Sequence, residues 1–393
     1  MKEAYIVSAV RTPGCKRAKG AFKDTLPLDL ISFILKASVD KIKLDPNEID
    51  DVMIGCAFPE AEQGLNIGRN AAKIAGFPDK VSGATVNRFC ASGLEAIADA
   101  AMRIMAGWCD VTIGAGVESM TYVPMGGNLP RPYPDLEKKQ IDLFISMGTT
   151  AENVAKRYNV TRQQQDEFAL LSQQKAANAQ KKGLFTEIVP TPATKFVTQA
   201  DGTVKRETFI QSFDDGVRDD TTLAGLAKLR PAFSLTGSVT AGNSSQTTDG
   251  AASTVLMSAE KAKALGLKPL AKFKLFTTIG CRSDEMGVGP RYAIPKLLDK
   301  AGLKVEDIGV WEINEAFASQ ALYSMRELGI DKYLDRVNIN GGAIALGHPL
   351  GCTGAKLAAT LIANMQARGA KYGVESMCIG GGMGAAALFE LCD

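Results

Sequence analysis

The segment LDPNEIDDVMIGCAF at residues 44–58 can be laid on LKVEDIGVWEINEAF at residues 303–317 without a gap. Leucine, two isoleucines, alanine and phenylalanine then occupy matching positions in the two segments. Both segments contain a short apolar run of the kind that forms a buried strand. Two matching segments in the two halves of one chain indicate an internal duplication of a mixed α/β unit.

A second pair of features repeats with equal spacing. Cys90 precedes an expected helix that ends at Gly107, and Cys352 precedes one that ends at Gly369, so both spacings are 17 residues. In the first copy, Ser92-Gly93-Leu94-Glu95 predicts a capping box at the start of the helix. The glycines at the far ends predict the helix stops.

The order of elements predicts how the sheet is built. The helix that follows Cys90 has one apolar face, and the apolar strand Val111-Thr112-Ile113-Gly114 comes after it. Strand–helix–strand order implies a largely parallel sheet covered by helices. The segment that follows is rich in polar residues, and one long helix is expected in it from Thr161 to Lys182. Thr161 and Gln164 are expected to cap the start of this helix.

These changes divide the chain into three parts. We expect a first half formed by residues 1–117 together with 248–270, and a second half over 271–393. Residues 118–247 are expected to form an inserted loop domain that lies over the core.

Composition excludes several classes of function. The 393 residues include 45 Lys and Arg against 43 Asp and Glu, which gives a net charge of +2. A charge this close to zero creates no overall electrostatic attraction for nucleic acid or for a membrane surface. No apolar stretch reaches the roughly 18 residues that cross a bilayer. Eight cysteines without a CxxC pair, and a single histidine, argue for a reducing compartment and against a metal site. The opening MKEAYIV has the pattern of a strand and not of a signal peptide.

Two thiols and one imidazole are the candidate reactive groups. Cys90 lies at a strand-to-helix turn, where the helix N-terminus favours a thiolate, although a buried structural thiol is an equal alternative. Cys378 precedes a glycine-rich turn whose N–H groups could face a negative charge. His348 lies in a second glycine-rich segment, and the alternative to a catalytic role is a histidine that only forms part of a loop. One thiol could be the nucleophile with His348 as its base, and the other could move a proton.

Three further features give weaker evidence for a catalytic or binding role. Asn314 is the repeat mate of Gly55 and could orient a water or an oxyanion, or only close a turn. Cys352 is interpreted as a small side chain that packs beside a turn. The glycines after Cys378 could form a dinucleotide fingerprint, but no helix or acidic ribose partner follows them.

Together these residues resemble the thiolase family over essentially the whole chain. The resemblance is carried by six motifs in the family's order: NRFCASG (87–93), MGTTAEN (147–153), TAGNSS (240–245), NEAFA (314–318), GGAIALGHPLG (341–351) and CIGGGMG (378–384).

The resemblance implies an α/β fold of two duplicated mixed-sheet halves in a five-layer αβαβα sandwich, with an inserted loop domain. It also implies that Cys90 carries the acyl group as a thioester and that His348 takes its proton. Cys378 would be the acid/base that protonates the departing enolate. Asn314, through a water, and the backbone of Gly380 would complete two oxyanion holes.

The same resemblance implies a site for coenzyme A, which is a substrate and not a resident cofactor. No metal is implied. The residues that would line the CoA channel or supply charge for its phosphates are Met147, Arg218, Leu226, Lys228, Phe233 and Ser245.

Details of the motifs favour the degradative 3-ketoacyl-CoA thiolases, which produce acetyl-CoA and a shortened acyl-CoA in fatty acid β-oxidation. Biosynthetic acetoacetyl-CoA thiolases carry a histidine where this chain has Ser146, and their long cationic tetramerisation loop is missing before Met147. An acetoacetyl-CoA thiolase that condenses two acetyl-CoA is the alternative. A decarboxylating ketoacyl synthase and a non-catalytic lipid-binding relative are more remote.

The resemblance also implies partners and a compartment. We expect a homodimer, with a dimer of dimers as the alternative, and a hydratase/dehydrogenase is a further candidate partner. Because no peroxisomal targeting extension precedes the first strand, the sequence predicts a cytoplasmic protein.

Overall fold

A large mixed sheet organises the computed structural model, which describes residues 2–139 and 141–392. Its strands follow the order β10-β11-β12-β9-β1-β8-β5-β3-β4, and the short β2 pairs with β8. The strands are β1 (Ala4–Arg11), β2 (Cys15–Lys16), β3 (Asp51–Gly55), β4 (Ser82–Val86), β5 (Val111–Ser119), β8 (Thr248–Ser258), β9 (Ala271–Gly280), β10 (Val310–Ile313), β11 (Tyr372–Ile379) and β12 (Met383–Leu391).

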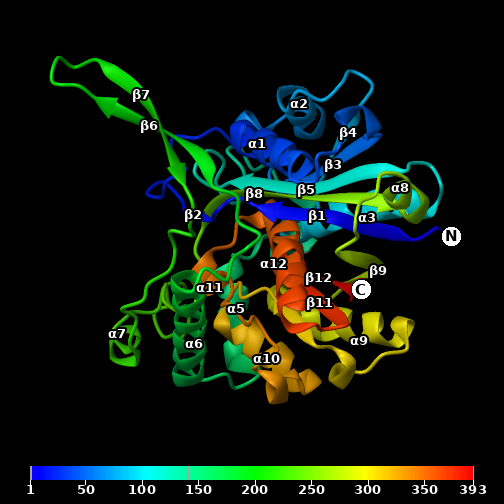
Figure 1. The fold of residues 1–393 in the computed structure, drawn as a ribbon. Coiled ribbons are helices and arrows are strands. Elements are labelled where there is room, and N and C mark those ends of the chain that lie inside the picture. Colours follow the sequence, from blue (N-terminus) through cyan, green and yellow to red (C-terminus); the bar gives the residue numbers. More distant parts are fainter. Residues whose placement is uncertain (1, 140, 393) are drawn as a thin grey trace.

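Helices cover and separate the two halves of this sheet (Figure 1). The central layer consists of α3 and α12, which contact each other and both halves of the sheet. Because apolar side chains of both central helices meet both halves, one core cluster spans the middle of the molecule. The outer layers bury two further cores, one under α1 and α2 and one under α9 and α10. The helices are α1 (Pro27–Asp40), α2 (Ile67–Ile74), α3 (Ser92–Met105), α9 (Gly289–Ala301), α10 (Ala318–Leu328) and α12 (Thr353–Arg368).

This arrangement confirms the expected α/β sandwich and its duplication. The expectation of a largely parallel sheet is wrong, because only β3 with β4, β3 with β5 and β10 with β11 pair in parallel, and the other strand pairs of this sheet are antiparallel. The strands β3 and β10, which come from the two matching segments, each pair in parallel with the strand that follows a central helix. Val52 lies beside Ile113 in one half, and Trp311 lies beside Val374 in the other. The halves join where β1 runs antiparallel to β9.

The predicted helix ends are partly right. Gly107 and Gly369 follow α3 and α12 with positive φ values of 77° and 60°. The capping box predicted at 92–95 is wrong, because Ser92 is already helical and its hydroxyl bonds the turn before it. Glu95 instead forms an ion pair with Arg88, with a Nη2–Oε1 distance of 2.8 Å.

The polar segment between the halves forms its own group of elements. Its long helix α6 begins with the predicted capping box of Thr161 and Gln164. The expected domain boundaries stay predictions, and their end residues Met1 and Asp393 lie outside the described residues. The elements of this segment are α4 (Pro134–Lys139), α5 (Met147–Arg157), α6 (Arg162–Lys181), β6 (Thr191–Thr198), β7 (Val204–Gln211) and α7 (Leu223–Ala227).

A buried cation ties this segment to the sheet. Arg11 of β1 forms two bonds to Asp214, of 2.7 and 3.0 Å, and one of 3.0 Å to Glu187. All three side chains are almost inaccessible to solvent. Breaking one partner would leave a buried charge unpaired, so this contact holds the polar segment over the core.

The remaining elements are short, and several of them form the turns around the site. Across residues 2–139 and 141–392, no helix is both long and apolar enough to cross a membrane. The short elements are η1 (Pro46–Glu48), η2 (Ala61–Gln63), η3 (Phe89–Ala91), η4 (Ile141–Phe144), α8 (Ala259–Ala264), η5 (Ser283–Val288), η6 (Val305–Asp307), η7 (Ile330–Tyr333), α11 (Ala343–Leu346) and η8 (Leu350–Cys352).

Candidate active site

The three reactive side chains predicted from the sequence lie on neighbouring elements. Cys90 is in η3 just before α3, Cys378 is near the end of β11, and His348 precedes η8. The turn η3 contacts both η8 and β11. Cys90 and Leu350 share one small apolar cluster, and all three reactive side chains are buried. The fold therefore brings together groups separated by more than 250 residues.

The backbone before Cys90 is strained. Phe89 has a φ of +44°, a left-handed conformation that costs an aromatic residue about 1–3 kcal/mol. Two side chains stabilise it: the amide oxygen of Asn87 accepts from the Phe89 N–H at 2.8 Å, and the Ser92 hydroxyl donates to the Phe89 carbonyl at 2.6 Å. This tight turn places the Cys90 thiol at the start of α3, facing the end of β11.

The environment of Cys90 keeps its thiol protonated. Burial raises the pKa of Cys90 to about 12, while hydrogen bonds from the N–H groups of Gly380 and of Cys90 itself act in the opposite direction. The same N–H groups would stabilise negative charge that develops beside the sulfur. Because the thiol is protonated near neutral pH, Cys90 needs a base to become a nucleophile.

His348 is the candidate for that base. Its Nδ1 lies 2.5 Å from the Thr353 hydroxyl, which in turn donates to the Pro349 carbonyl at 3.0 Å. Since that hydroxyl proton is used, Thr353 accepts from Nδ1–H and leaves Nε2 unprotonated. Burial, and then the charge of Lys356, lower the pKa of His348 to about 3, so the ring is neutral at physiological pH.

Asn314 completes this side of the site. It follows β10, is fully buried, and its Nδ2 lies 3.4 Å from Nε2 of His348. Its backbone is held by Ser376 and Gln320, at 2.9 and 2.8 Å. The side-chain oxygen of Asn314 has no hydrogen-bond partner within the described part of the chain. A buried amide with an unused acceptor is suited to orient a water or substrate.

Cys378 faces a more apolar environment. Burial is the main cause that raises its pKa, and the neighbouring Cys90 adds to the effect. Its apolar cluster includes Met147, Met286 and Phe317. A neutral thiol in such surroundings can donate a proton to carbon and take one back.

Four of the six residues expected to bind CoA lie along one path to this cluster. A Cβ on Gly380 would lie 3.8 Å from the Met147 sulfur, and one on Gly148 would collide with the Phe233 ring. That ring also packs edge-on against Phe317, with a centroid distance of 5.9 Å. Ser245 and Leu226 lie on the adjoining segments, where the Ser245 N–H donates to the Ala316 carbonyl and Leu226 packs on Gly242.

The two expected phosphate-binding cations lie apart from this cluster. Arg218 and Lys228 are exposed to solvent at the edge of the polar segment. Only the backbone of Arg218 is anchored, because its N–H donates to the Gln173 side chain at 2.8 Å.

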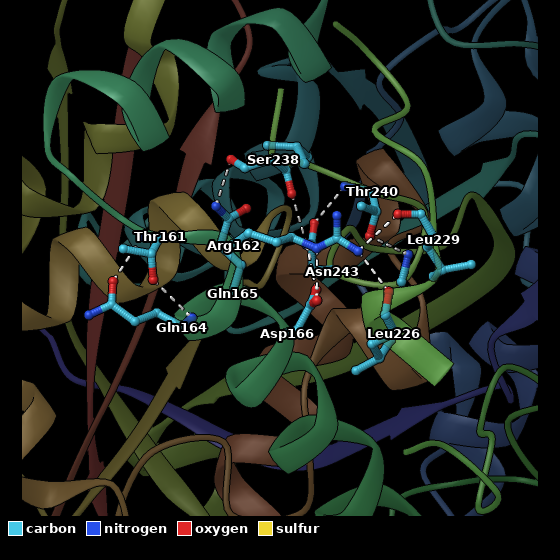
Figure 2. A network of polar contacts seen from close by, with 12 residues as sticks. Thr161, Arg162, Gln164, Gln165, Asp166, Leu226, Leu229, Ser238, Thr240 and Asn243 are labelled. Carbon is cyan, nitrogen blue, oxygen red and sulfur yellow. Dashed lines mark hydrogen bonds and ion pairs between the residues drawn. The ribbon is translucent and has the colours of Figure 1, made fainter. Parts of the chain in front are cut away.

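A polar network on α6 sets the position of the segments that carry Leu226 and Ser245 (Figure 2). Arg162 donates to the carbonyls of Leu226 and Leu229 at 2.7 and 2.9 Å. Asp166 pairs with Arg162 and accepts from the Asn243 amide at 2.9 Å. One helix face therefore holds both α7 and the 238–245 loop.

Sequence reasoning missed several residues that shape the site. Thr353 sets the tautomer of His348, Met286 lies against Cys378, and Glu118 and Lys356 hold the turn that carries His348. Only Glu118 left a signal in the sequence, as a carboxylate at the end of a strand that is otherwise apolar. Within residues 2–139 and 141–392, no three His, Cys, Asp or Glu side chains are grouped to hold a metal ion.

Comparisons with known proteins agree with this geometry. Residues 4–260 match the thiolase N-terminal domain, and residues 267–391 match the thiolase C-terminal domain. The chain is 53% identical to the 3-ketoacyl-CoA thiolase of Bacillus subtilis over 393 residues, covering 100% of both chains. It is 48% identical to the peroxisomal 3-ketoacyl-CoA thiolase B of Mus musculus over 392 residues, covering 99% of this chain and 91% of the mouse protein.

Solved structures extend the likeness to three dimensions. The Bacillus anthracis acetyl-CoA acetyltransferase superimposes with a TM-score of 0.89 at 39% identity, covering 100% of this chain and 99% of that one. The dimeric peroxisomal thiolase of Saccharomyces cerevisiae superimposes with a TM-score of 0.87 at 41% identity, covering 100% and 98%. With both domains matched in order and relatives similar along the whole length, this chain belongs to the thiolase family.

Proposed function

We propose that this protein is a 3-ketoacyl-CoA thiolase that uses CoA to cleave 3-ketoacyl-CoA into acetyl-CoA and a shortened acyl-CoA. The observation that carries this proposal is a pair of neighbouring buried thiols, Cys90 and Cys378, with the Gly380 N–H directed at Cys90 and the neutral imidazole of His348 next to the adjoining turn. Carbon–carbon cleavage needs a nucleophile for the ketone, donors for the oxyanion and an acid for the departing carbon.

The first half-reaction forms a thioester on the enzyme. Nε2 of His348 takes the proton of Cys90, and the sulfur attacks the C3 carbonyl of the substrate. The C2–C3 bond then breaks, and the electron pair leaves as the enolate of acetyl-CoA. The thiol of Cys378 protonates that enolate carbon, which releases acetyl-CoA and leaves a Cys378 thiolate.

The second half-reaction transfers the acyl group. The Cys378 thiolate takes the proton of the CoA thiol, and the CoA sulfur attacks the thioester on Cys90. The Cys90 thiolate leaves and recovers its proton from His348. In both halves the N–H groups of Cys90 and Gly380 serve one oxyanion, and His348 with a water held by Asn314 serves the other. No metal or resident cofactor takes part in this scheme.

The substrate class follows the relatives and the local sequence. The Bacillus subtilis and mouse relatives are named 3-ketoacyl-CoA thiolases, whereas the Bacillus anthracis structure is named an acetyl-CoA acetyltransferase at lower identity. Ser146, where biosynthetic thiolases are expected to have histidine, accepts from the Thr149 N–H and caps α5. An acetoacetyl-CoA thiolase that condenses two acetyl-CoA is the second candidate, because the same groups run the reaction in reverse.

We further propose a homodimer that joins at β4. This strand is the open edge of the sheet, and α2 and α3 flank it with Ile74 and Met102 more than half exposed. An open edge with apolar neighbours is suited to pair with a second copy. Met102→Glu should convert the dimer to a monomer in sedimentation-velocity experiments, whereas Leu334→Glu, at an exposed position after η7 in the second half, should not. A dimer that persists in Met102→Glu would place the interface elsewhere.

We propose a cytoplasmic location, since Cys15, Cys56, Cys90, Cys109, Cys281, Cys352 and Cys378 are thiols without a disulfide partner and that state suits a reducing compartment. A hydratase/dehydrogenase that supplies 3-ketoacyl-CoA is a candidate partner. Fractionation of the host cell with activity measurements would test the compartment.

The test of function is CoA-dependent cleavage of 3-ketoacyl-CoA esters from four to sixteen carbons long. We expect wild-type protein to cleave the longer esters and Cys90→Ala to lose activity by at least about a thousandfold, because the scheme then lacks the sulfur that carries the acyl group. Cleavage restricted to acetoacetyl-CoA would favour the second candidate. Full activity in Cys90→Ala would disprove the mechanism.

A further inference from the structure

Two buried charged side chains hold the two ends of the turn that carries His348. At the first end, Nζ of Lys356 donates to the Gly347 carbonyl at 3.4 Å. At the other end, Oε2 of Glu118 accepts from the Gly351 N–H at 2.7 Å. A cation on a carbonyl and an anion on an amide are both charge-assisted hydrogen bonds, which are stronger than neutral ones.

Glu118 also connects this turn to the segment at Ala57, which lies beside Cys90. Its Oε2 accepts from the Ala57 N–H at 2.8 Å, and its Oε1 accepts from the Gln63 amide. All of these partners are donors, so they favour the ionised carboxylate and oppose burial, which raises the pKa of Glu118 to about 7. Ala57 packs against Cys90, so one carboxylate connects the surroundings of the nucleophile with the turn of the base.

The approach of the turn to Glu118 is so close that only glycine fits. A Cβ on Gly351 would lie 2.4 Å from the Ala57 nitrogen and 2.7 Å from Oε2 of Glu118. The space between the turn and the segment at Ala57 is therefore filled by backbone atoms and the Glu118 carboxylate.

Lys356 holds the other end in an equally confined place. Gly347 has a φ of +85°, and a Cβ there would lie 2.2 Å from the Thr248 hydroxyl. The next residue, His348, donates its N–H to the Gln246 carbonyl at 3.0 Å and also to that hydroxyl, at 3.1 Å. Lys356 is buried on the first turn of α12, where burial and then the charge of Arg11 lower its pKa, and Asp214 acts in the opposite direction.

We propose that Glu118 and Lys356 are positioning residues that hold the His348 turn at both ends and so set the imidazole relative to Cys90. This inference rests on the proposed role of His348 as the base of Cys90. Neither side chain is placed to touch the substrate, so their effect passes through His348.

The test follows alkylation of Cys90 by iodoacetamide, with the labelled peptide quantified by mass spectrometry. Glu118→Gln puts an amide donor where donors already converge, and Lys356→Met removes the cation. Each change should slow alkylation about tenfold at pH 7.5, because a misplaced base loses much of its effect. In a His348→Ala background, neither change should slow alkylation further. Slowing of the same size in both backgrounds would overturn the proposal.

Steady-state kinetics give an independent readout. Both variants should lose about tenfold in kcat with the KM for CoA unchanged, and Lys356→Arg should recover most of the rate, because a guanidinium also donates to a carbonyl. A raised KM with an unchanged kcat would count against positioning. Glu375→Gln, which alters a buried carboxyl group that has no hydrogen-bond partner in the described chain, is the matched control and should keep the wild-type rate.

Two outcomes separate this inference from the proposed function. If wild-type protein cleaves no 3-ketoacyl-CoA while Cys90 alkylation still depends on His348, Glu118 and Lys356, the proposed function fails and the positioning roles hold. If Glu118→Gln does not fold, the comparison of Lys356→Met with Lys356→Arg decides, since both retain Glu118.

Discussion

At the scale of single residues, the position of one proton decides what His348 can do. The Thr353 hydroxyl fixes that proton on Nδ1, because its own hydrogen is committed to the Pro349 carbonyl. Nε2 is then free to accept from the Cys90 thiol, beside the Asn314 amide. A tautomer held by a neighbour in this way suits a base, because the lone pair on Nε2 stays available to accept a proton.

Replacing Thr353 with valine should therefore impair the base without changing its shape. Valine keeps the volume but removes the acceptor for Nδ1–H, so the other tautomer becomes populated. We expect kcat for thiolysis to fall roughly tenfold or more, with the KM for CoA unchanged. Thr360→Val on the same helix, whose hydroxyl bonds Glu187 and not the histidine, is the control. Equal losses in both variants would contradict a role for the tautomer.

At the scale of elements, α6 positions the CoA-binding segments although it provides none of the expected site residues. Its capping box was recognisable in the sequence because Thr161 and Gln164 are three residues apart. The capping box predicted for α3 was wrong because Ser92 has a better local partner, the strained backbone at Phe89. Local patterns thus predict helix ends well only where no functional turn competes for the same hydroxyl.

The α6 network predicts a binding defect when Arg162 is changed. Arg162→Met removes the donor to the Leu226 and Leu229 carbonyls and leaves Asp166 without its cation. We expect the KM for CoA to rise about tenfold, equivalent to losing one charged hydrogen bond of about 1.4 kcal/mol, with kcat within twofold of wild type.

The control for this prediction lies on the same helix. Gln163 is exposed and bonds only Glu167 within the described part of the chain, so Gln163→Ala should leave both constants unchanged. A fall in kcat with an unchanged KM in Arg162→Met would show that α6 serves the chemistry and not the binding of CoA.

At the scale of the whole molecule, the two sheet halves enclose carboxylates that the proposed mechanism does not use. Glu312 and Glu375 lie side by side on the parallel strands β10 and β11. Burial raises the pKa of Glu312 to about 8 and raises that of Glu375 well above its usual range. The carboxyl oxygens of Glu375 have no hydrogen-bond partner in the described chain, so both groups are held in their neutral form.

These carboxyls should make the fold less stable as the pH rises. A glutamate with a raised pKa binds its proton more tightly in the folded chain, so its contribution is complete below pH 4.5 and is lost as the pH passes the folded pKa. Between about pH 5 and 8 the free energy of unfolding should fall by roughly 1.4 kcal/mol per pH unit for each such group.

Glu375→Gln tests this argument because the amide cannot ionise. We expect its Tm to exceed that of wild type at pH 8 by a few degrees and to match it at pH 4.5, measured by differential scanning calorimetry. Glu306→Gln, at an exposed site, should follow wild type at both values. A Glu375→Gln variant that is less stable at pH 8 would mean that the carboxylate is charged and partnered in the folded chain.

The sequence by itself determined the duplicated α/β organisation, because matching apolar segments must bury equivalent strands. It also determined the reactive set of Cys90, His348 and Cys378, since motifs rich in glycine and small residues mark where backbone meets chemistry. Whether those residues carry the proposed roles is for the variants above to decide.

Only the tertiary structure decided how that set works. Glu118 contacts the His348 turn from the other half of the molecule, and no local pattern encodes that contact. Thr353 and Lys356 are near His348 in sequence, but they contact its turn only because the chain folds back over the start of α12. The left-handed Phe89 likewise depends on the close packing of η3 against β11 and η8. Side chains whose effect comes from a partner distant in sequence are invisible until the chain has folded, because their energy lies in the contact and not in the residue type.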